Sequence, residues 1–264
     1  MTYEGVLTKM QTEFSNPIQY YLVFSTSFLS LNQLLDKSME INFIGYQCLN
    51  CGKKKKIFRQ GFCYDCFMSS ASAGDWIMKP ELSTAHLDIE DRDLEYEKKV
   101  QLQPHIVYLA LSSDVKVGVT RKTQVPTRWI DQGAVQAIPI VEVPNRFLAG
   151  ITEVALKNHF ADKTNWQKML KNETPEVDLL KEKASLKYLI PKEVQEYYDV
   201  DKNDLYELHF PVLEYPKKVT SLNLDKSPNF SGKLTGIKGQ YLLFEDGTVF
   251  NVRTFEGYVV KISI

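Results

Sequence analysis

The sequence of 264 residues has few cysteines, few histidines and almost no net charge. Its formal charge is −1 at neutral pH, so the molecule as a whole has no field that would steer it to nucleic acid, although a local basic patch remains compatible with such binding. No apolar run reaches the length of a membrane span, because the apolar stretch 20–31 is interrupted by Ser and Thr. The N-terminus lacks the charged-then-apolar pattern of a signal peptide. We therefore expect a cytoplasmic protein with no membrane partner.

The remaining composition is typical of an ordered globular protein. Hydrophobic residues make up 44% of the chain, which also carries 14 tyrosines and 14 phenylalanines. A chain of this length can bury roughly 70–75% of the surface that its unfolded form exposes. The length predicts one or two domains, with room for a small inserted module.

All four cysteines lie in one short stretch, as two CxxC pairs: Cys48 with Cys51, and Cys63 with Cys66. The short spacer within each pair lets a tight turn point both sulfurs at one ion, and Gly52 permits the turn that follows the first pair. This spacing predicts a Zn²⁺ ion held by four thiolates rather than a disulfide or a redox pair. Four protein ligands leave no open position for water, so the zinc would be structural.

The loop between the two pairs is the most basic part of the chain. Its cations are Lys53–Lys56 and Arg59, and the aromatic residues Phe58, Phe62, Tyr64 and Phe67 interleave with them. Such a mixture suits contacts to phosphates and bases. It is also typical of a solvated loop whose aromatic side chains pack on a small metal core. The sequence leaves both interpretations open.

The stretch 105–171 carries the pattern on which the functional prediction depends. Residues 106–111 and 115–120 are β-rich and are separated by a compact turn, which predicts an antiparallel hairpin. A third strand is predicted over 135–143, where Pro139 favours a position at the edge of the sheet. Helices are predicted over 127–132, from Asn145 to about His159, and over 163–170.

Four positions on these elements resemble the motifs of the GIY-YIG nuclease domain, especially its divergent branch with KIG in place of YIG. Tyr108 ends the run Ile-Val-Tyr on the first strand, and Lys116-Val117-Gly118 follows on the second. Arg128 lies on the first predicted helix and Glu153 on the second. The whole chain also resembles an uncharacterised bacterial family that joins such a domain to a four-cysteine cluster.

This resemblance implies catalytic roles for three of the residues. Tyr108 would orient or deprotonate the attacking water. Arg128 would steady the charge on the phosphoryl group, and Glu153 would hold a catalytic Mg²⁺ or Mn²⁺ ion. The implied activity is metal-dependent cleavage of a phosphodiester in nucleic acid.

Two further residues match the family pattern, and two depart from it. Gly118 matches a glycine where a side chain would block close approach, and Asn165 matches a downstream polar residue; we assign both to cofactor binding. Ile106 stands where the first motif has its glycine. Lys116 replaces the second tyrosine; it could stabilise a phosphate as a fourth catalytic residue, but it cannot act as a phenol at neutral pH.

The helical surroundings of Glu153 support a site that faces inward. Ala149, Leu156 and Phe160 share its face of the predicted helix. A carboxylate on an apolar face is costly unless it is paired or binds a metal. A salt bridge with Arg128, or a solvated pair with Lys157, would also account for the pattern.

The predicted fold class is α+β: a small GIY-YIG-like antiparallel sheet with flanking helices, a four-cysteine zinc module, and a β-rich part from both ends of the chain. The predicted order is a β-rich segment 1–47, the zinc module 48–80, an acidic linker 81–104, the GIY-YIG-like domain 105–171, a helical connection 172–216 and a β-rich segment 217–264 that shares a sheet with 1–47. The acidic run 86–99 is expected to be a loop or a solvated helix. Within the C-terminal segment, Lys238-Gly239 and Asp246-Gly247 predict hairpin turns.

These observations predict a metal-dependent phosphodiesterase that acts on DNA or RNA. From 104 to 171 cations outnumber anions nine to five, which favours a phosphate-containing substrate. The departures at Ile106 and Lys116 favour an alternative, a non-catalytic nucleic-acid-binding protein that retains the fold. An interaction protein without a nucleic-acid role is a third class.

Overall fold

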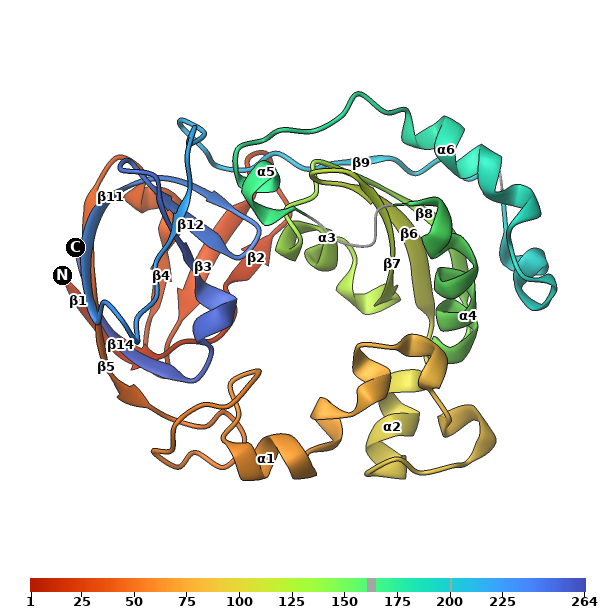
Figure 1. Cartoon of the computed structure of the whole chain (residues 1–264), viewed down its shortest axis with the longest axis horizontal. Helices are drawn as coiled ribbons and strands as arrows, with labels where there is room; N and C mark the ends of the chain where they lie inside the picture. Colours follow the sequence, from red (N-terminus) through yellow and green to blue (C-terminus); the bar gives the residue numbers. More distant parts are fainter. Residues whose placement is uncertain (161–164, 200) are drawn as a thin grey trace. The chain divides into compact units, whose positions relative to one another are not determined.

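The computed structural model describes residues 1–160, 165–199 and 201–264, which divide into two compact units (Figure 1). The first unit comprises Met1–Ser69, Ile130–Gly133 and His209–Ile264. The second comprises Ser70–Trp129 and Ala134–Leu208. Helices and several sheets occur together, so the predicted α+β class is confirmed at that level.

The first unit is built on a sheet to which both ends of the chain contribute. Its strand order is β1-β14-β5-β11-β12-β13-β10. Strand β1 pairs antiparallel with β14, and β14 with β5. The bounds are β1 Thr2–Val6, β5 Ser38–Tyr46, β10 Thr220–Ser221, β11 Asn229–Lys238, β12 Tyr241–Phe244, β13 Thr248–Asn251 and β14 Tyr258–Ser263, with a 3₁₀ turn η10 at Val252–Phe255.

Both predicted glycine turns in this sheet are confirmed. Gly239 joins β11 to β12 with φ +62°, and Gly247 joins β12 to β13 with φ +82°. Residues with a Cβ rarely adopt this left-handed conformation, which is why Lys-Gly and Asp-Gly mark the reversals so clearly.

A second sheet of the same unit contains β2 Gln11–Glu13, β3 Gln19–Val23 and β4 Phe28–Ser30, followed by the 3₁₀ turn η1 Leu31–Leu34. The run 18–24 suggests a strand buried on both faces, but burial alternates along β3. Tyr20 and Leu22 are buried, whereas Tyr21 is partly exposed and meets Phe28 edge to face at 6.1 Å. Aromatic residues on the outer face made this strand look more buried than it is.

The second unit contains a four-stranded sheet in the order β7-β6-β8-β9. Strand β6 (His105–Leu111) is buried throughout and pairs antiparallel with β7 (Val115–Arg121), which confirms the predicted hairpin. On its other side β6 pairs antiparallel with β8 (Gln136–Val143). The short β9 (Tyr206–Glu207) follows β8.

The edge position predicted from Pro139 is wrong, because β9 pairs with β8 at Gln136 and Ala137. The sheet accommodates the proline through an irregular register with β6. Val107 faces Val141, and the next residue, Tyr108, faces Pro139. The residue skipped on β8 bends the strand where the proline cannot donate a hydrogen bond.

Helix α4 (Arg146–Leu156) packs on one face of this sheet, as seen in Figure 1. It begins after Asn145, whose side chain accepts a hydrogen bond from the N–H of Leu148 at 2.9 Å. Its Ala149 and Leu156 join Val107 and Leu109 of β6 in the core. Glu153 is therefore carried by a helix that is fixed to the sheet.

Shorter helices complete both units. In the second unit α2 spans Leu94–Gln101, α5 spans Trp166–Leu170 and α6 spans Leu179–Ser185, while α3 (Thr127–Asp131) starts in the second unit and ends in the first. Its 3₁₀ turns are η2 Ala71–Ala73, η3 Asp75–Ile77, η4 Pro80–Leu82, η5 Ala85–Leu87, η6 Lys122–Gln124, η7 Lys157–His159, η8 Leu186–Tyr188 and η9 Lys192–Tyr197. The predicted helix 163–170 is observed from Trp166 onward; positions 163 and 164 lie outside the described residues. In the first unit α1 spans Tyr64–Ser69.

The acidic run 86–99 is not uniformly solvated as expected. Its Glu97 is fully buried on α2, where the carboxylate accepts hydrogen bonds from the N–H groups of Asp91, Arg92 and Asp93 at 3.0, 2.7 and 3.1 Å. These bonds compensate for the loss of water around the charge. Across the described ranges, no helix combines the length and apolar character needed to cross a membrane.

Candidate functional site

The four cysteines converge as their spacing predicts. The Sγ atoms of Cys48, Cys51, Cys63 and Cys66 all lie within 4.8 Å of one another. Tetrahedral coordination with Zn–S bonds of about 2.3 Å separates the sulfurs by roughly 3.8 Å. The Sγ atoms of Cys51 and Cys63 are 4.0 Å apart. The four thiols are thus close enough to bind one metal ion such as zinc.

Two tight turns bring the thiols together. After the first pair, Gly52 adopts φ +69° and its N–H donates to the carbonyl oxygen of Cys48 at 2.9 Å. Before the second pair, Gly61 adopts φ +76°, and a Cβ there would lie 2.4 Å from Leu49 Cδ1. The N–H of Cys63 then donates to the Sγ of Cys48 at 3.3 Å, which links the two turns directly.

The thiols differ in acidity because their surroundings differ. Burial raises the pKa of Cys48, but the N–H groups of Cys51, Cys63 and Asn50 outweigh it and bring the value to about 6. Asn50 lowers the pKa of Cys66, but burial and hydrogen bonds with the other three thiols raise it to about 11. The thiol of Cys48 therefore ionises readily, whereas that of Cys66 does not. A bound cation would stabilise the thiolate of Cys66 and so favour its ionisation.

In the basic loop beside the cysteines, some aromatic side chains pack on the metal-binding core and others are exposed beside cations. Phe62 packs on the buried cysteines. In contrast, Phe58 and Tyr64 are 47% and 58% exposed and meet edge to face at 5.2 Å. The guanidinium of Arg59 lies 5.5 Å from the centre of the Phe58 ring. Part of the aromatic set is structural, and part presents an exposed face beside cations.

A second candidate site is a group of half-buried charged side chains in the second unit, which we call the charged cluster. It consists of Glu81 on η4, Arg121 at the end of β7, Arg128 on α3, and Arg146 and Glu153 on α4. Burial and the neighbouring Glu81 raise the pKa of Glu153 to about 7, against the opposing effect of Arg146, Arg128 and Lys157. Glu153 thus faces two arginines and another carboxylate.

Glu81 reaches this cluster through a close backbone contact at Gly150. A Cβ at position 150 would lie 2.2 Å from the main-chain nitrogen of Glu81, so only glycine lets η4 lie on α4 at this point. Gly150 is one helical turn before Glu153. No sequence pattern points to Glu81, because its role depends on packing between segments far apart in the chain.

Arg146 fixes the same segment to α4. Its Nε and Nη2 donate to the carbonyl oxygens of Trp76 and Ile77 at 3.2 and 2.8 Å. Its guanidinium also lies 5.5 Å from the centre of the Trp76 ring. Burial lowers the pKa of Arg146 to about 10, and the nearby cations Arg121 and Arg128 contribute to the shift. Arg146 therefore links the segment around η3 and η4 to the helix that carries Glu153.

Among the residues singled out by the sequence, Arg128, Lys116 and Glu153 interact. Arg128 acts electrostatically on Glu153 and on Lys116. Burial lowers the pKa of Lys116 to about 8, and Arg128 lowers it further. Both Arg128 and Lys157 lower the pKa of Glu153 electrostatically, after the larger effect of Arg146.

Tyr108 and Asn165, which the sequence also singled out, make contacts typical of structural residues. Tyr108 is completely buried, with its ring over Gly118 and edge to face with Trp129 at 5.6 Å. The side-chain oxygen of Asn165 caps α5 by accepting from the N–H groups of Gln167 and Lys168 at 3.1 and 3.2 Å. The main-chain N–H of Asn165 donates to Ser113 Oγ at 2.8 Å, which ties α5 to the turn of the β6–β7 hairpin.

Comparison with known families covers most of the chain. A family model described as "Protein of unknown function (DUF2797)" matches residues 36–260. The chain belongs to this family. The matched range of this DUF2797 chain contains the four cysteines and the whole charged cluster. No curated protein and no solved structure matches the chain.

Proposed function

We propose that this protein is a metal-dependent phosphodiesterase that cleaves nucleic acid at a divergent GIY-YIG-type site in its second unit. The hairpin β6–β7 and the helices α3 and α4 present Tyr108, Gly118, Arg128 and Glu153 in the order that the resemblance requires. The observation that carries the proposal is the half-buried carboxylate of Glu153 on α4, in a cluster where Arg146 and Arg128 act on it electrostatically. A carboxylate and a guanidinium in one cluster can serve a metal ion and a phosphate, respectively.

The carboxylates of the charged cluster suit a hard divalent ion. Glu153 and Glu81 supply oxygen donors of the kind that Mg²⁺ and Mn²⁺ prefer. Burial and mutual repulsion disfavour the ionised form of Glu153, and a cation would relieve both effects. When bound, such an ion polarises a phosphoryl oxygen and stabilises the leaving group.

The cations of the site would act on the substrate itself. The guanidinium of Arg128 would bind the non-bridging phosphate oxygens and neutralise the charge that develops on them. Lys116, which interacts with Arg128, would add a second positive charge on the same phosphate. In this proposal the hydroxyl of Tyr108 orients the attacking water.

One observation favours a second candidate function, a non-catalytic nucleic-acid-binding protein. Tyr108 is 0% exposed, whereas a residue that positions water must reach solvent or substrate. Together with lysine at position 116, this placement is compatible with a site that binds phosphate through Arg128 but does not cleave it. The two candidates differ in their dependence on Glu153 and on a divalent ion.

We assign the four cysteines to a structural Zn²⁺ in either case, because four thiolates complete a tetrahedral shell. The exposed Phe58 and Tyr64, with the guanidinium of Arg59 near the Phe58 ring, then offer stacking faces and charge to a nucleic-acid strand. This surface belongs to the first unit and would add binding energy without contributing to the chemistry.

The test compares Glu153→Gln with Glu173→Gln, a change at another carboxylate, which pairs with Lys171 at 2.7 Å. Labelled single- and double-stranded DNA and RNA are incubated with Mg²⁺, with Mn²⁺ or without added divalent ion. We expect cleavage by the wild type and Glu173→Gln, no cleavage by Glu153→Gln, and none without added Mg²⁺ or Mn²⁺. Undiminished cleavage by Glu153→Gln would refute the mechanism. Binding that falls with salt, without any cleavage, would establish the second candidate.

A further inference from the structure

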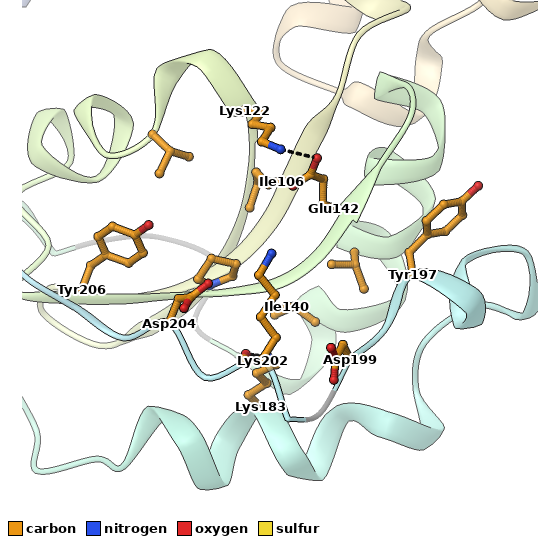
Figure 2. A pocket seen from close by; sticks show the side chains of 13 residues that line it. Ile106, Lys122, Ile140, Glu142, Lys183, Tyr197, Asp199, Lys202, Asp204 and Tyr206 are labelled. Atoms are coloured by element: carbon orange, nitrogen blue, oxygen red, sulfur yellow. Dashed lines mark hydrogen bonds and ion pairs between the residues drawn. The ribbon is translucent and has the colours of Figure 1, made fainter.

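A pocket opens beside β6 and β8 of the second unit, on the face of the sheet to which Ile106 points (Figure 2). Its volume is about 270 Å³. Ile106, Pro139 and Val141 form an apolar floor. Tyr206 lies on one side of the opening and Tyr197 on the other, as Figure 2 shows. The pocket therefore has an apolar base with a tyrosine on each side of its opening.

Charged groups surround this apolar floor. Lys122 and Glu142 form an ion pair of 2.7 Å at one side. At the other side Lys183, which is 1% exposed, donates a hydrogen bond to the carbonyl oxygen of Lys202. That bond holds the main chain at Lys202 beside the pocket. Lys202 and the nearby carboxylates offer both donors and acceptors at the rim.

We infer that this pocket receives one unpaired nucleobase of the nucleic-acid substrate, an inference that rests on the proposed function. Cavities that hold small molecules measure roughly 300–1,000 Å³, so this one lies at the lower limit and admits a single ring system but not a duplex. The apolar floor and the phenol of Tyr197 suit the faces of a base. The mixed donors and acceptors of the rim suit its polar edge.

The position of the pocket along the strand connects it to the proposed site. Ile106 and Tyr108 lie on the same face of β6, two residues or about 6.6 Å apart. Lys122 and Val125, which also line the pocket, belong to the segment that leads into α3 and Arg128. Val107 and Leu109 pack on α4, so the pocket lies on the face of β6 opposite to α4. In this inference, a strand whose phosphate contacts Arg128 places a nearby base in the pocket. A paired base cannot enter, so the substrate must be single-stranded or must have the base turned out of the helix.

The experiment measures binding of a labelled single-stranded oligonucleotide to the full-length protein by fluorescence anisotropy, without added Mg²⁺ or Mn²⁺ so that no cleavage occurs and without chelator so that the zinc is retained. Tyr197→Ala removes one side of the pocket. Tyr188→Ala is the matched control, because Tyr188 is 89% exposed and does not line the pocket. We expect Tyr197→Ala to weaken binding roughly 5- to 150-fold, as for loss of one base-stacking contact, and Tyr188→Ala to leave it unchanged. An oligonucleotide of abasic sites should bind the wild type and Tyr197→Ala equally.

The outcomes separate this inference from the proposed function. Equal binding of the intact oligonucleotide by wild type and Tyr197→Ala would overturn the pocket inference, even if Glu153-dependent cleavage is observed. Conversely, mononucleotides that bind the wild type but not Tyr197→Ala would support a base pocket even if no nucleic acid is cleaved. If the wild type binds neither oligonucleotides nor mononucleotides, the inference is refuted. Lys202→Glu provides a second variant at an exposed position of the rim, and we expect it to weaken binding as well.

Discussion

The phenol of Tyr108 lies against Gly118, its direct partner on the neighbouring strand. A Cβ at position 118 would be only 2.7 Å from the Tyr108 hydroxyl oxygen and 2.8 Å from the ring carbon that bears it. Trp129 packs against the same ring edge to face, and both aromatic residues are completely buried. The glycine that the motif pattern singled out is thus required by the tyrosine that the same pattern singled out.

Gly118→Ala should consequently destabilise the protein by about 1–3 kcal/mol, the usual cost of overpacking a well-packed core. The buried Tyr108 ring has Trp129 beside it and cannot move aside freely. Denaturation in urea would measure the effect. Gly45→Ala in β5 is the control, because nothing lies within 4 Å of its added Cβ. Equal loss of stability in the two variants would contradict this explanation.

Local patterns predicted much of the fold. The reversals at Gly239 and Gly247 and the β6–β7 hairpin each depend on residues adjacent in sequence, so composition and alternation suffice to locate them. The spacing of the four cysteines likewise identified their cluster. The burial of Glu97 was missed, because its compensating N–H groups come from a turn whose geometry an acidic run does not reveal.

The charged cluster could be predicted only in part. Arg128 and Glu153 follow from the motif order, but Glu81 is brought to them by a backbone contact at Gly150. Arg146 was counted only as a positive charge, whereas its guanidinium binds the carbonyl oxygens of Trp76 and Ile77. Both contacts join segments that are far apart in sequence, and no local pattern encodes such pairings.

We predict one zinc ion per chain, bound by the four cysteines, and a loss of stability when it is removed. Metal-binding free energy is folding free energy in such small segments, so removal of the ion should destabilise the turns at Gly52 and Gly61. Elemental analysis of protein purified without chelator gives the zinc content. Cys66→Ser should lower both the zinc content and the thermal midpoint. Full zinc occupancy in Cys66→Ser would contradict the four-thiolate site.

The buried His105 should make the protein sensitive to mild acid. Burial lowers its pKa from 6.5 to about 4, and the cations Arg146 and Arg121 add to the shift, while a hydrogen bond between Nδ1 and the Gln103 carbonyl oxygen opposes it. The folded state therefore binds fewer protons than the unfolded state between these two pH values. The contribution of His105 to stability should fall by roughly 3 kcal/mol in total as the pH drops from about 6.5 to 4, whereas the raised pKa of Glu153 acts in the opposite direction over much of this range.

His105→Phe tests this assignment, because it keeps an aromatic ring of similar shape and removes the titration. Relative to the wild type, its unfolding free energy should increase by roughly 3 kcal/mol as the pH falls from 6.5 to 4, because only the wild type must protonate the buried imidazole. An unchanged denaturant slope would show that the variant retains the fold. If the two proteins lose stability in parallel over this range, another group is responsible for the acid sensitivity.

Arg146 and Arg128 both act electrostatically on Glu153, but their replacement should have different effects. Arg146 donates to two main-chain carbonyl oxygens and stacks on Trp76, so Arg146→Ala should chiefly reduce stability, by about 1.5–3 kcal/mol for each charged hydrogen bond lost. In the proposed mechanism Arg128 contacts the phosphoryl group. Arg128→Ala should chiefly reduce the cleavage rate, by roughly 10²–10³-fold, as for other preorganised groups that stabilise developing charge.

Urea denaturation and single-turnover cleavage on the same two variants separate these effects. The ratio of rates is compared where both variants are fully folded, so that lost stability does not register as lost activity. Arg146→Lys adds a further distinction, because it keeps the charge near Glu153 but cannot reproduce the fork that reaches both carbonyl oxygens. It should therefore remain destabilised while cleaving at nearly the wild-type rate. If Arg128→Ala cleaves normally and Arg146→Lys does not, the phosphate contact belongs to Arg146 and the assignment of Arg128 is wrong.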